Sequence, residues 1–297
     1  PRSISNIPAS VRERLRNVSL QSGKEFQSII RQYVQERFLY RLSKSVYGNS
    51  FILKGALLFI AYDISRLRPT KDIDFLGSSI SNDEKDIKAI FKEILQVGYE
   101  DGLVFDYENI RTEIIAEDGN YHGVRVKIDA FLLNIRERLQ IDIGFDDKIV
   151  PGPADLIFPA LLDFPAPRLK AYSIESALAE KFEAMVSINL FTSRVKDVYD
   201  IIYFADFYNF KKDSLKNALM ATFSNRGTDI EKRELVFSSE FKEDPQRKDM
   251  WKVFLSRSKL NPGYNFSEAV NKIKIFIDPI FTEENASTWN PSKWKWE

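Results

Sequence analysis

The chain has 297 residues, of which 44% are hydrophobic and 29% are charged, a composition typical of a globular protein with one or two domains. Its 43 basic and 43 acidic residues cancel, so any attraction to nucleic acid or membrane must come from local patches. The lack of cysteine and the single histidine, His122, exclude thiol catalysis and argue against a Ser-His-Asp triad or a multi-histidine metal site, which leaves carboxylates, lysines, hydroxyls and a hard cation for catalysis.

The N-terminal segment is polar and lacks the hydrophobic region of a signal peptide, and no apolar run reaches the roughly 20 residues of a membrane span. We therefore expect a cytoplasmic protein that does not use a membrane. Residues 9–46 are predicted to be mainly helical, with a break near Gly23, because apolar residues recur there at helical spacing. The rest of this surface, which includes Arg37, is rich in basic residues and is either a solvated face or a surface that contacts phosphates.

A short strand at residues 51–53 is predicted to end at the sequence Lys54-Gly55-Ala56, and an apolar helix is predicted over residues 56–62. At such a strand–glycine–helix step, the bare backbone of a helix N-terminus can approach a phosphate. A basic loop follows and leads into a second strand at residues 73–76. The basic residues of this loop are Arg66, Arg68 and Lys71.

Asp72 and Asp74 stand where this loop enters the second strand. Side chains two residues apart on a strand point to the same face, so both carboxylates converge. Two like charges held close together are costly unless a cation lies between them, and the pair is therefore a candidate magnesium site. The motif taken alone is weak, because Asp-x-Asp also occurs by chance in many loops.

A third acid, Asp142, lies in the middle of an alternating strand at residues 138–146. A helix is predicted at residues 81–97, and strands are predicted at residues 104–107, 111–115 and 124–133. If its face of the strand is covered, Asp142 is costly without a partner. Three such carboxylates would hold two magnesium ions for an in-line displacement at a phosphoryl group. The alternative is that Asp142 faces solvent.

Five prolines between residues 151 and 167 predict a loop or linker, and we place the domain boundary there. The prediction is an α/β domain at residues 1–165, which includes N-terminal helices, followed by a mainly helical domain at residues 166–297. Helices are expected at residues 174–189, 193–209, 214–223 and 267–277. The tryptophans near the C-terminus are expected to dock onto the body of the fold.

A second cluster of charged residues lies on two of these helices. Lys181 falls at the edge of an apolar stripe, and Asp197 and Asp200 are three residues apart, so they share one helix face. A lysine oriented by an aspartate is suited to contact a triphosphate. The alternative is a pair of amphipathic helices whose charges are solvated.

These motifs, in this order, resemble the nucleotidyl transferase AbiEii/AbiGii toxin family of defence and toxin–antitoxin loci. The resemblance covers nearly the whole chain, through residues 35–43, 51–58, 69–76, 140–145, 166–172, 179–186 and 194–203. It implies the fold of DNA polymerase β-type nucleotidyltransferases, which is a mixed sheet with flanking helices, here followed by the helical domain.

The resemblance also implies roles for individual residues. Gly55 begins the glycine step, Asp72 and Asp74 are the metal-binding pair, Asp142 is the third acid, and Lys181 binds the triphosphate. Asp197 is implied to be essential, with Asp200 as its partner. The superfamily usually has a second Gly or Ser where this chain has Ala56, which puts a side-chain phosphate contact there in doubt. Asp146 and Asp147 are close enough to Asp142 that the assignment of the third acid could shift.

The implied activity is magnesium-dependent transfer of a nucleoside monophosphate (NMP) from an NTP to an RNA end, which the family resemblance implies to be that of a tRNA, with release of pyrophosphate. The implied outcome is growth arrest, as in abortive infection and antiviral defence, and the implied partner is a cognate antitoxin. Arg37, Arg66, Arg68 and Lys71 are the candidate RNA-binding residues. The alternatives are transfer to a hydroxyl of a protein or small molecule, and a catalytically silent protein that binds a nucleotide or a partner.

Overall fold

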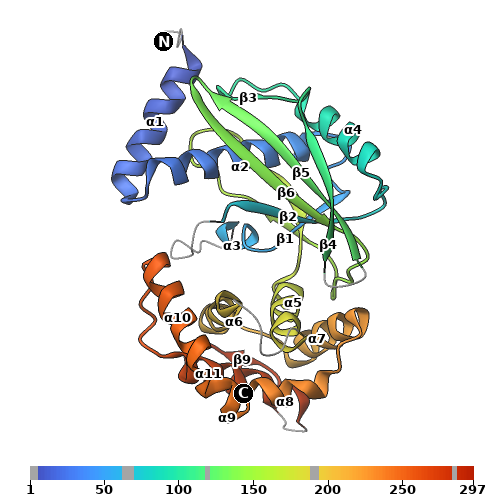
Figure 1. The fold of residues 1–297 in the computed structure, drawn as a ribbon, viewed down its shortest axis with the longest axis vertical. Coiled ribbons are helices and arrows are strands. Elements are labelled where there is room, and N and C mark those ends of the chain that lie inside the picture. The colour runs from blue at the N-terminus through green and yellow to red at the C-terminus, as the bar shows by residue number, and fades with distance from the viewer. Residues whose placement is uncertain (1–5, 62–69, 118–120, 188–193, 283–285) are drawn as a thin grey trace. The chain divides into compact units, whose positions relative to one another are not determined.

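The chain divides into two compact units in the computed structural model (Figure 1), which describes residues 6–61, 70–117, 121–187, 194–282 and 286–297. The first unit consists of residues 1–146 and 154–171, and the second consists of residues 147–153 and 172–297. The chain therefore leaves the first unit after residue 146, returns to it at residue 154, and leaves it again after residue 171.

The first unit is a mixed sheet with helices. In chain order its elements are α1 (Ile7–Ser22), α2 (Phe26–Lys44), β1 (Phe51–Lys54), α3 (Leu58–Ala61), β2 (Asp72–Gly77), α4 (Glu84–Leu95), β3 (Val104–Phe105), β4 (Arg111–Glu117), β5 (Tyr121–Leu132), β6 (Ile135–Gly144), β7 (Ala154–Ile157) and β8 (Arg168–Ala171). The predicted break in the N-terminal helix is confirmed, because Gly23 ends α1 in the left-handed conformation with φ of 68°.

The strand order of the sheet is β3-β5-β6-β2-β1-β8-β7, and β4 pairs with β5. β2 runs parallel to β6, and β1 runs antiparallel to β2 and parallel to β8. Helices α2 and α4 pack against the sheet, and α2 passes behind β5 and β6 in Figure 1. On the central strands, Ile73, Phe75, Ile141 and Ile143 are fully buried, whereas Asp72, Asp74, Gln140 and Asp142, which alternate with them, are polar. The sheet therefore has one apolar face and one polar face.

The proline-rich segment is not simply a loop, and this part of the prediction is wrong. Residues 154–157 and 168–171 form β7 and β8, which pair with each other, and β8 extends the sheet beside β1. The prolines flank these strands and leave their interiors free of proline, so the backbone donors of the strands remain available. The predicted helix after Gly55 is also shorter than expected, because a turn precedes α3 at Leu58; residue 62 lies outside the described residues.

The second unit is mainly helical. Its elements are α5 (Ile174–Ser187), α6 (Val195–Phe207), α7 (Lys212–Arg226), the 3-10 helix η1 (Ile230–Lys232), α8 (Arg233–Val236), α9 (Ser239–Glu243), α10 (Pro245–Ser258), α11 (Phe266–Ile277), the 3-10 helix η2 (Asp278–Phe281), β9 (Trp289–Asn290) and β10 (Lys295–Trp296). The predicted fold class, a mixed sheet with flanking helices followed by helices, is confirmed. Helices α8 to α10 were not predicted.

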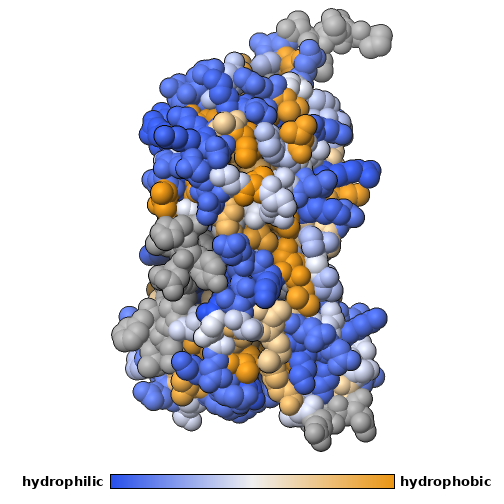
Figure 2. Space-filling view, turned by 90° about the vertical axis from the view of Figure 1, so that its right-hand side faces the viewer, coloured by the Kyte–Doolittle hydropathy of each residue, from blue (hydrophilic) through white to orange (hydrophobic). Residues whose placement is uncertain are grey.

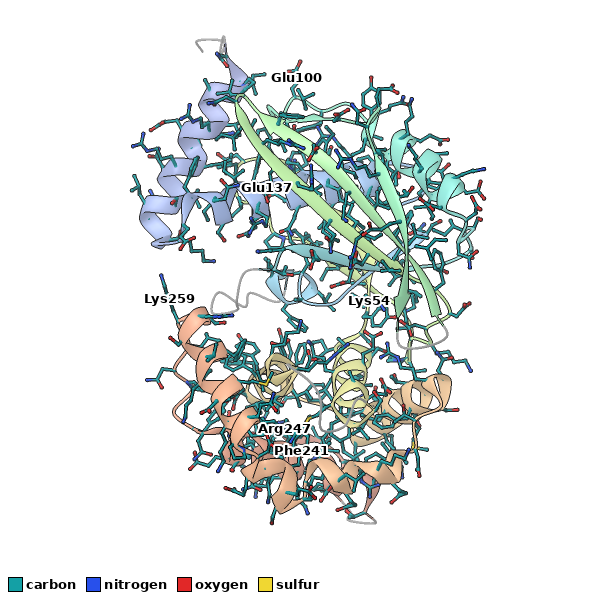
Figure 3. All side chains as sticks on the ribbon, in the orientation of Figure 1. Lys54, Glu100, Glu137, Phe241, Arg247 and Lys259 are labelled. Atoms are coloured by element: carbon teal, nitrogen blue, oxygen red, sulfur yellow. The ribbon has the colours of Figure 1, made fainter. Side chains whose placement is uncertain are left out.

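Aromatic side chains form much of the second core. Trp289 is fully buried and donates its indole N–H to the Ala205 carbonyl at 2.7 Å, and Trp296 donates to the Phe276 carbonyl at 2.8 Å. The expected docking of the C-terminal tryptophans is thereby confirmed. Elsewhere in this unit, the Arg247 guanidinium lies 4.3 Å from the ring centre of Phe241 (Figure 3).

On the face drawn in Figure 2, hydrophilic residues predominate and the hydrophobic ones form small patches among them. Among the described residues, no helix is both long and apolar enough to span a membrane.

Candidate active site

Strand β2 places the predicted Asp-x-Asp pair on the polar face of the sheet. Asp72 and Asp74 are partly exposed, and Ile73 between them is fully buried. Because side chains alternate along a strand, both carboxylates lie on the face opposite α2 and α4. The sequence prediction that the two acids share one face agrees with this geometry.

Strand register places two more of the predicted residues beside this pair. Asp74 is directly opposite Lys54 on β1 and directly opposite Asp142 on β6. Paired residues of neighbouring strands point to the same face, so Lys54, Asp74 and Asp142 form one row across three strands. Lys54 is the last residue of β1 and is 7% exposed (Figure 3).

Gly55 lies against the Asp74 side chain. Its φ of 67° is in the left-handed region that favours glycine, and a Cβ added at this position would overlap the Asp74 carboxylate. Gly55 therefore gives Asp74 the space it occupies. The approach of Gly55 to a phosphate stays a prediction.

Asp142 is held by a residue that the sequence analysis did not single out. Arg125, its register partner on β5, donates from Nε to Oδ1 at 2.7 Å and from Nη2 to Oδ2 at 2.8 Å. This hydrogen bonding to Asp142 raises the pKa of Arg125 above its ordinary value, although partial burial acts in the opposite direction. The signal for Arg125 was the alternation of residues 124–128, which places Arg125 and Lys127 on one face.

The alternative third acids lie elsewhere. Asp146 follows the end of β6 with a φ of 68°, outside the paired part of the strand. Asp147 belongs to the second unit, where its carboxylate accepts a hydrogen bond from the Tyr172 hydroxyl at 3.2 Å and lies 3.5 Å from Arg226. Asp142 alone among the three is in register with Asp74.

The donor chemistry of this row suits a hard cation, because Asp72, Asp74 and Asp142 are carboxylates on one face of adjacent strands. Within the described residues, however, no three or more acidic or histidine side chains are gathered closely enough to form a ready metal site. The bidentate pair with Arg125 engages both oxygens of Asp142. Among the described residues, the three carboxylates that could bind a cation are therefore present but are not gathered into one closed site.

The second predicted cluster comes together within the second unit. Lys181 of α5 donates from Nζ to Asp197 at 2.9 Å and to Asp200 at 2.6 Å, both on α6. Burial acts to lower the pKa of Lys181, but the two carboxylates outweigh it and raise that pKa, so the lysine is charged at neutral pH. Burial likewise acts to raise the pKa of Asp197, and the Lys181 ammonium outweighs it and lowers that pKa. The alternative of solvated helix charges is not supported, because both aspartates are buried.

The predicted role of Arg37 in RNA binding is wrong. Arg37 is fully buried and donates to the Pro165 carbonyl at 2.7 Å, and its guanidinium lies 4.8 Å from the ring centre of Tyr40. The error arose because α2 is buried on nearly all sides over its second half, so its charges are not on a surface. Lys71 is exposed, whereas Arg66 and Arg68 lie outside the described residues.

Comparison with known proteins shows that the chain is a nucleotidyltransferase. Residues 37–272 match the family described as "Nucleotidyl transferase AbiEii toxin, Type IV TA system", and the chain belongs to this family. The resemblance stated from the sequence motifs is confirmed. The protein is therefore a nucleotidyltransferase toxin, and its family implies an NTP as substrate and a cognate antitoxin as partner. A search of curated protein sequences found no match.

Comparison with solved structures found matches at low sequence identity. JHP933 from Helicobacter pylori is 15% identical with a TM-score of 0.50, over 86% of this chain and 92% of that one. A nucleotidyltransferase from H. pylori described as putative is 15% identical with a TM-score of 0.49, over 86% and 95% of the two chains. MenT4, a nucleotidyltransferase toxin from Mycobacterium tuberculosis, is 19% identical with a TM-score of 0.48, over 69% and 68%.

Proposed function

We propose that this toxin transfers NMP from an NTP to a hydroxyl group at the end of an RNA, specifically a tRNA, and releases pyrophosphate. The observation that carries the proposal is the register of β2 and β6, which sets Asp74 opposite Asp142 with Asp72 on the same face. The reaction forms a bond from the RNA hydroxyl oxygen to the α-phosphorus and breaks the bond from that phosphorus to the β-phosphate oxygen. It requires positioning and charge neutralisation more than covalent catalysis.

In this proposal Asp72, Asp74 and Asp142 hold two magnesium ions. Bound magnesium would neutralise the triphosphate and lower the pKa of the attacking hydroxyl. Asp142 would accept the hydroxyl proton once Arg125 releases one of its oxygens. Lys54, Gly55 and Ala56 would line the nucleotide site from the end of β1.

Lys181 is proposed to neutralise charge on the triphosphate. Its ammonium is fixed by Asp197 and Asp200, so its position costs little further entropy when a nucleotide binds. Asp197 and Asp200 are thus proposed to act through Lys181, and the essential role assigned to Asp197 is the orientation of this cation. The two aspartates also account for why a largely buried lysine remains charged.

For the acceptor, Lys71 is the described residue that supports an RNA contact, since it is exposed next to Asp72. Arg66 and Arg68, which lie outside the described residues, are proposed as further RNA contacts. We further propose that the protein acts in the cytoplasm and that its activity arrests growth as part of abortive infection and antiviral defence. The net charge of zero means that RNA binding must depend on local basic groups such as Lys71.

The test is a labelling assay. The purified chain is incubated with magnesium, total tRNA and each α-labelled NTP in turn, beside Asp74→Asn and Lys181→Ala variants. We expect label on tRNA with the wild-type chain and none with Asp74→Asn. With Lys181→Ala the rate of labelling should fall by about a hundredfold. Omission of magnesium or addition of a chelator should abolish the label.

The rival functions predict other products. Label on protein or on a small molecule, with none on tRNA, would keep the transferase chemistry and replace the acceptor. No label with any acceptor, although NTP binds normally, would contradict the proposed catalytic roles and favour a silent binding protein. Equal labelling by Asp74→Asn and wild type would remove the carboxylate row from the mechanism.

A further inference from the structure

Arg125 occupies the carboxylate that the proposed metal site needs. Both oxygens of Asp142 accept hydrogen bonds from it, at 2.7 and 2.8 Å, in the fork geometry that makes such pairs strong. The two residues are direct register partners in the long pairing of β5 with β6. Asp142 is 14% exposed and Arg125 is 30% exposed, so the pair is only partly screened by water.

The Arg125 guanidinium also lies near other acidic side chains. Its Nη1 lies 3.5 Å from Glu113 on β4, and the negative charge of Asp72 contributes to the raised pKa of Arg125. Asp72, Asp74 and Asp142 share one face, and nearby positive charge reduces their mutual repulsion. Lys54 lies opposite Asp74 in the register of β1 with β2, and Arg125 adds a second cation from β5, opposite Asp142.

A divalent cation and Arg125 therefore compete for the same oxygens. A cation that takes Asp142 as a ligand must share this carboxylate with the guanidinium, which repels the cation and already uses one lone pair of each oxygen. Loss of a charge-assisted hydrogen bond costs free energy, and this cost lowers the affinity of the site for the cation.

We propose that Arg125 is a positioning residue that clasps Asp142, the third acid, through two hydrogen bonds. A divalent cation must therefore compete with Arg125 to bind this carboxylate. In the metal-free state Arg125 holds Asp142 and offsets the negative charge of that carboxylate. When a cation binds, Arg125 releases one oxygen of Asp142 and keeps the other, which orients the carboxylate. This inference rests on the proposed function, since it takes Asp142 to be a metal ligand.

The test is Mn²⁺ binding to the full-length chain, measured by calorimetry without nucleotide. We expect Arg125→Gln to bind Mn²⁺ about tenfold more tightly than wild type, because a competitor for Asp142 is removed. Arg125→Lys keeps the charge but cannot form the fork, so its affinity should fall between the two. Asp142→Asn should weaken binding by about tenfold.

Arg138→Gln is the matched control. Arg138 forms a similar forked pair with Asp129 across the same two strands, at 2.9 and 3.3 Å, four residues along β6 from Asp142. Its loss should leave Mn²⁺ affinity within about twofold of wild type, since at roughly 13 Å along the strand the charge is well screened. A purely structural Arg125 would lower the melting temperature and leave the Mn²⁺ affinity unchanged.

The outcomes separate the two levels of argument. Unchanged or weaker Mn²⁺ binding by Arg125→Gln, with weaker binding by Asp142→Asn, would overturn the clasp and leave the metal site standing. If Arg125→Gln does not fold, Arg125→Lys decides the matter by the same comparison. Unchanged Mn²⁺ binding in both Asp74→Asn and Asp142→Asn would overturn the metal site itself, and the clasp with it.

Discussion

Gly55 and Asp74 depend on each other for their positions. The backbone of Gly55 has a positive φ, and the Asp74 carboxylate fills the space where any other residue would place its Cβ. At the level of single residues, the candidate site is therefore built from backbone geometry as much as from charge. A methyl group at residue 55 would move the carboxylate that the proposed chemistry needs most.

We predict that Gly55→Ala lowers transferase activity by on the order of a hundredfold while the protein remains folded. Displacement of a catalytic group by about 1 Å can cost on the order of a hundredfold in rate, and the left-handed backbone adds about 1 kcal/mol of strain. Gly23→Ala is the control, since Gly23 has a φ of 68° with nothing within 4 Å of an added Cβ. Activity of Gly55→Ala equal to that of Gly23→Ala in the labelling assay would contradict this view of Gly55.

At the scale of elements, alternation along a strand predicted that Asp72 and Asp74 share one face, and the structure agrees because this geometry depends on local periodicity alone. Arg125 was missed because its contact with Asp142 depends on the register of β5 against β6, which spacing along one strand does not determine. Arg37 was misplaced for a related reason. Its helix packs inside the first unit, where the Arg37 Nε lies 2.9 Å from Glu36, and charge counting along a helix does not reveal burial by distant segments.

Helix α2 carries a buried acid whose ionisation should control the stability of the first unit. Burial raises the pKa of Glu36 to about 7, although Arg37 and the Leu161 amide at 2.7 Å act to lower it. Between its ordinary value of 4.5 and about 7, the folded chain holds a proton that the unfolded chain has lost. Stability should therefore fall as pH rises through this window, by up to about 3 kcal/mol.

The prediction is tested with Glu36→Gln, which cannot titrate. The free energy of unfolding of this variant minus that of wild type should increase by up to about 3 kcal/mol from pH 5 to pH 8. Urea unfolding followed by far-UV circular dichroism would measure it. All four tryptophans lie in the second unit, so tryptophan fluorescence monitors that unit separately. A stability difference that stays constant with pH would show that Glu36 is ionised throughout.

At the scale of the whole molecule, the chain forms its two units from interleaved segments. Residues 147–153 belong to the second unit, where the Val150 amide donates to Ser176 at 3.0 Å, and residues 154–171 return to the first. Composition indicated a change of architecture in this region but not the return of the chain. Pairing of β8 with β1 joins residues more than a hundred positions apart, and no local pattern encodes that.

The interleaving predicts where the chain can be cut. A fragment of residues 1–171 keeps β8, in which Leu169 and Ala171 are buried, whereas a fragment of residues 1–165 loses it and leaves β1 as an unpaired edge. Exposed edge strands promote association between chains. We therefore expect fragment 1–171 to elute as a monomer and to melt cooperatively, and fragment 1–165 to aggregate or to melt without a clear transition. Size-exclusion chromatography and thermal circular dichroism would measure both, and identical behaviour of the two fragments would mean that β8 adds little to the first unit.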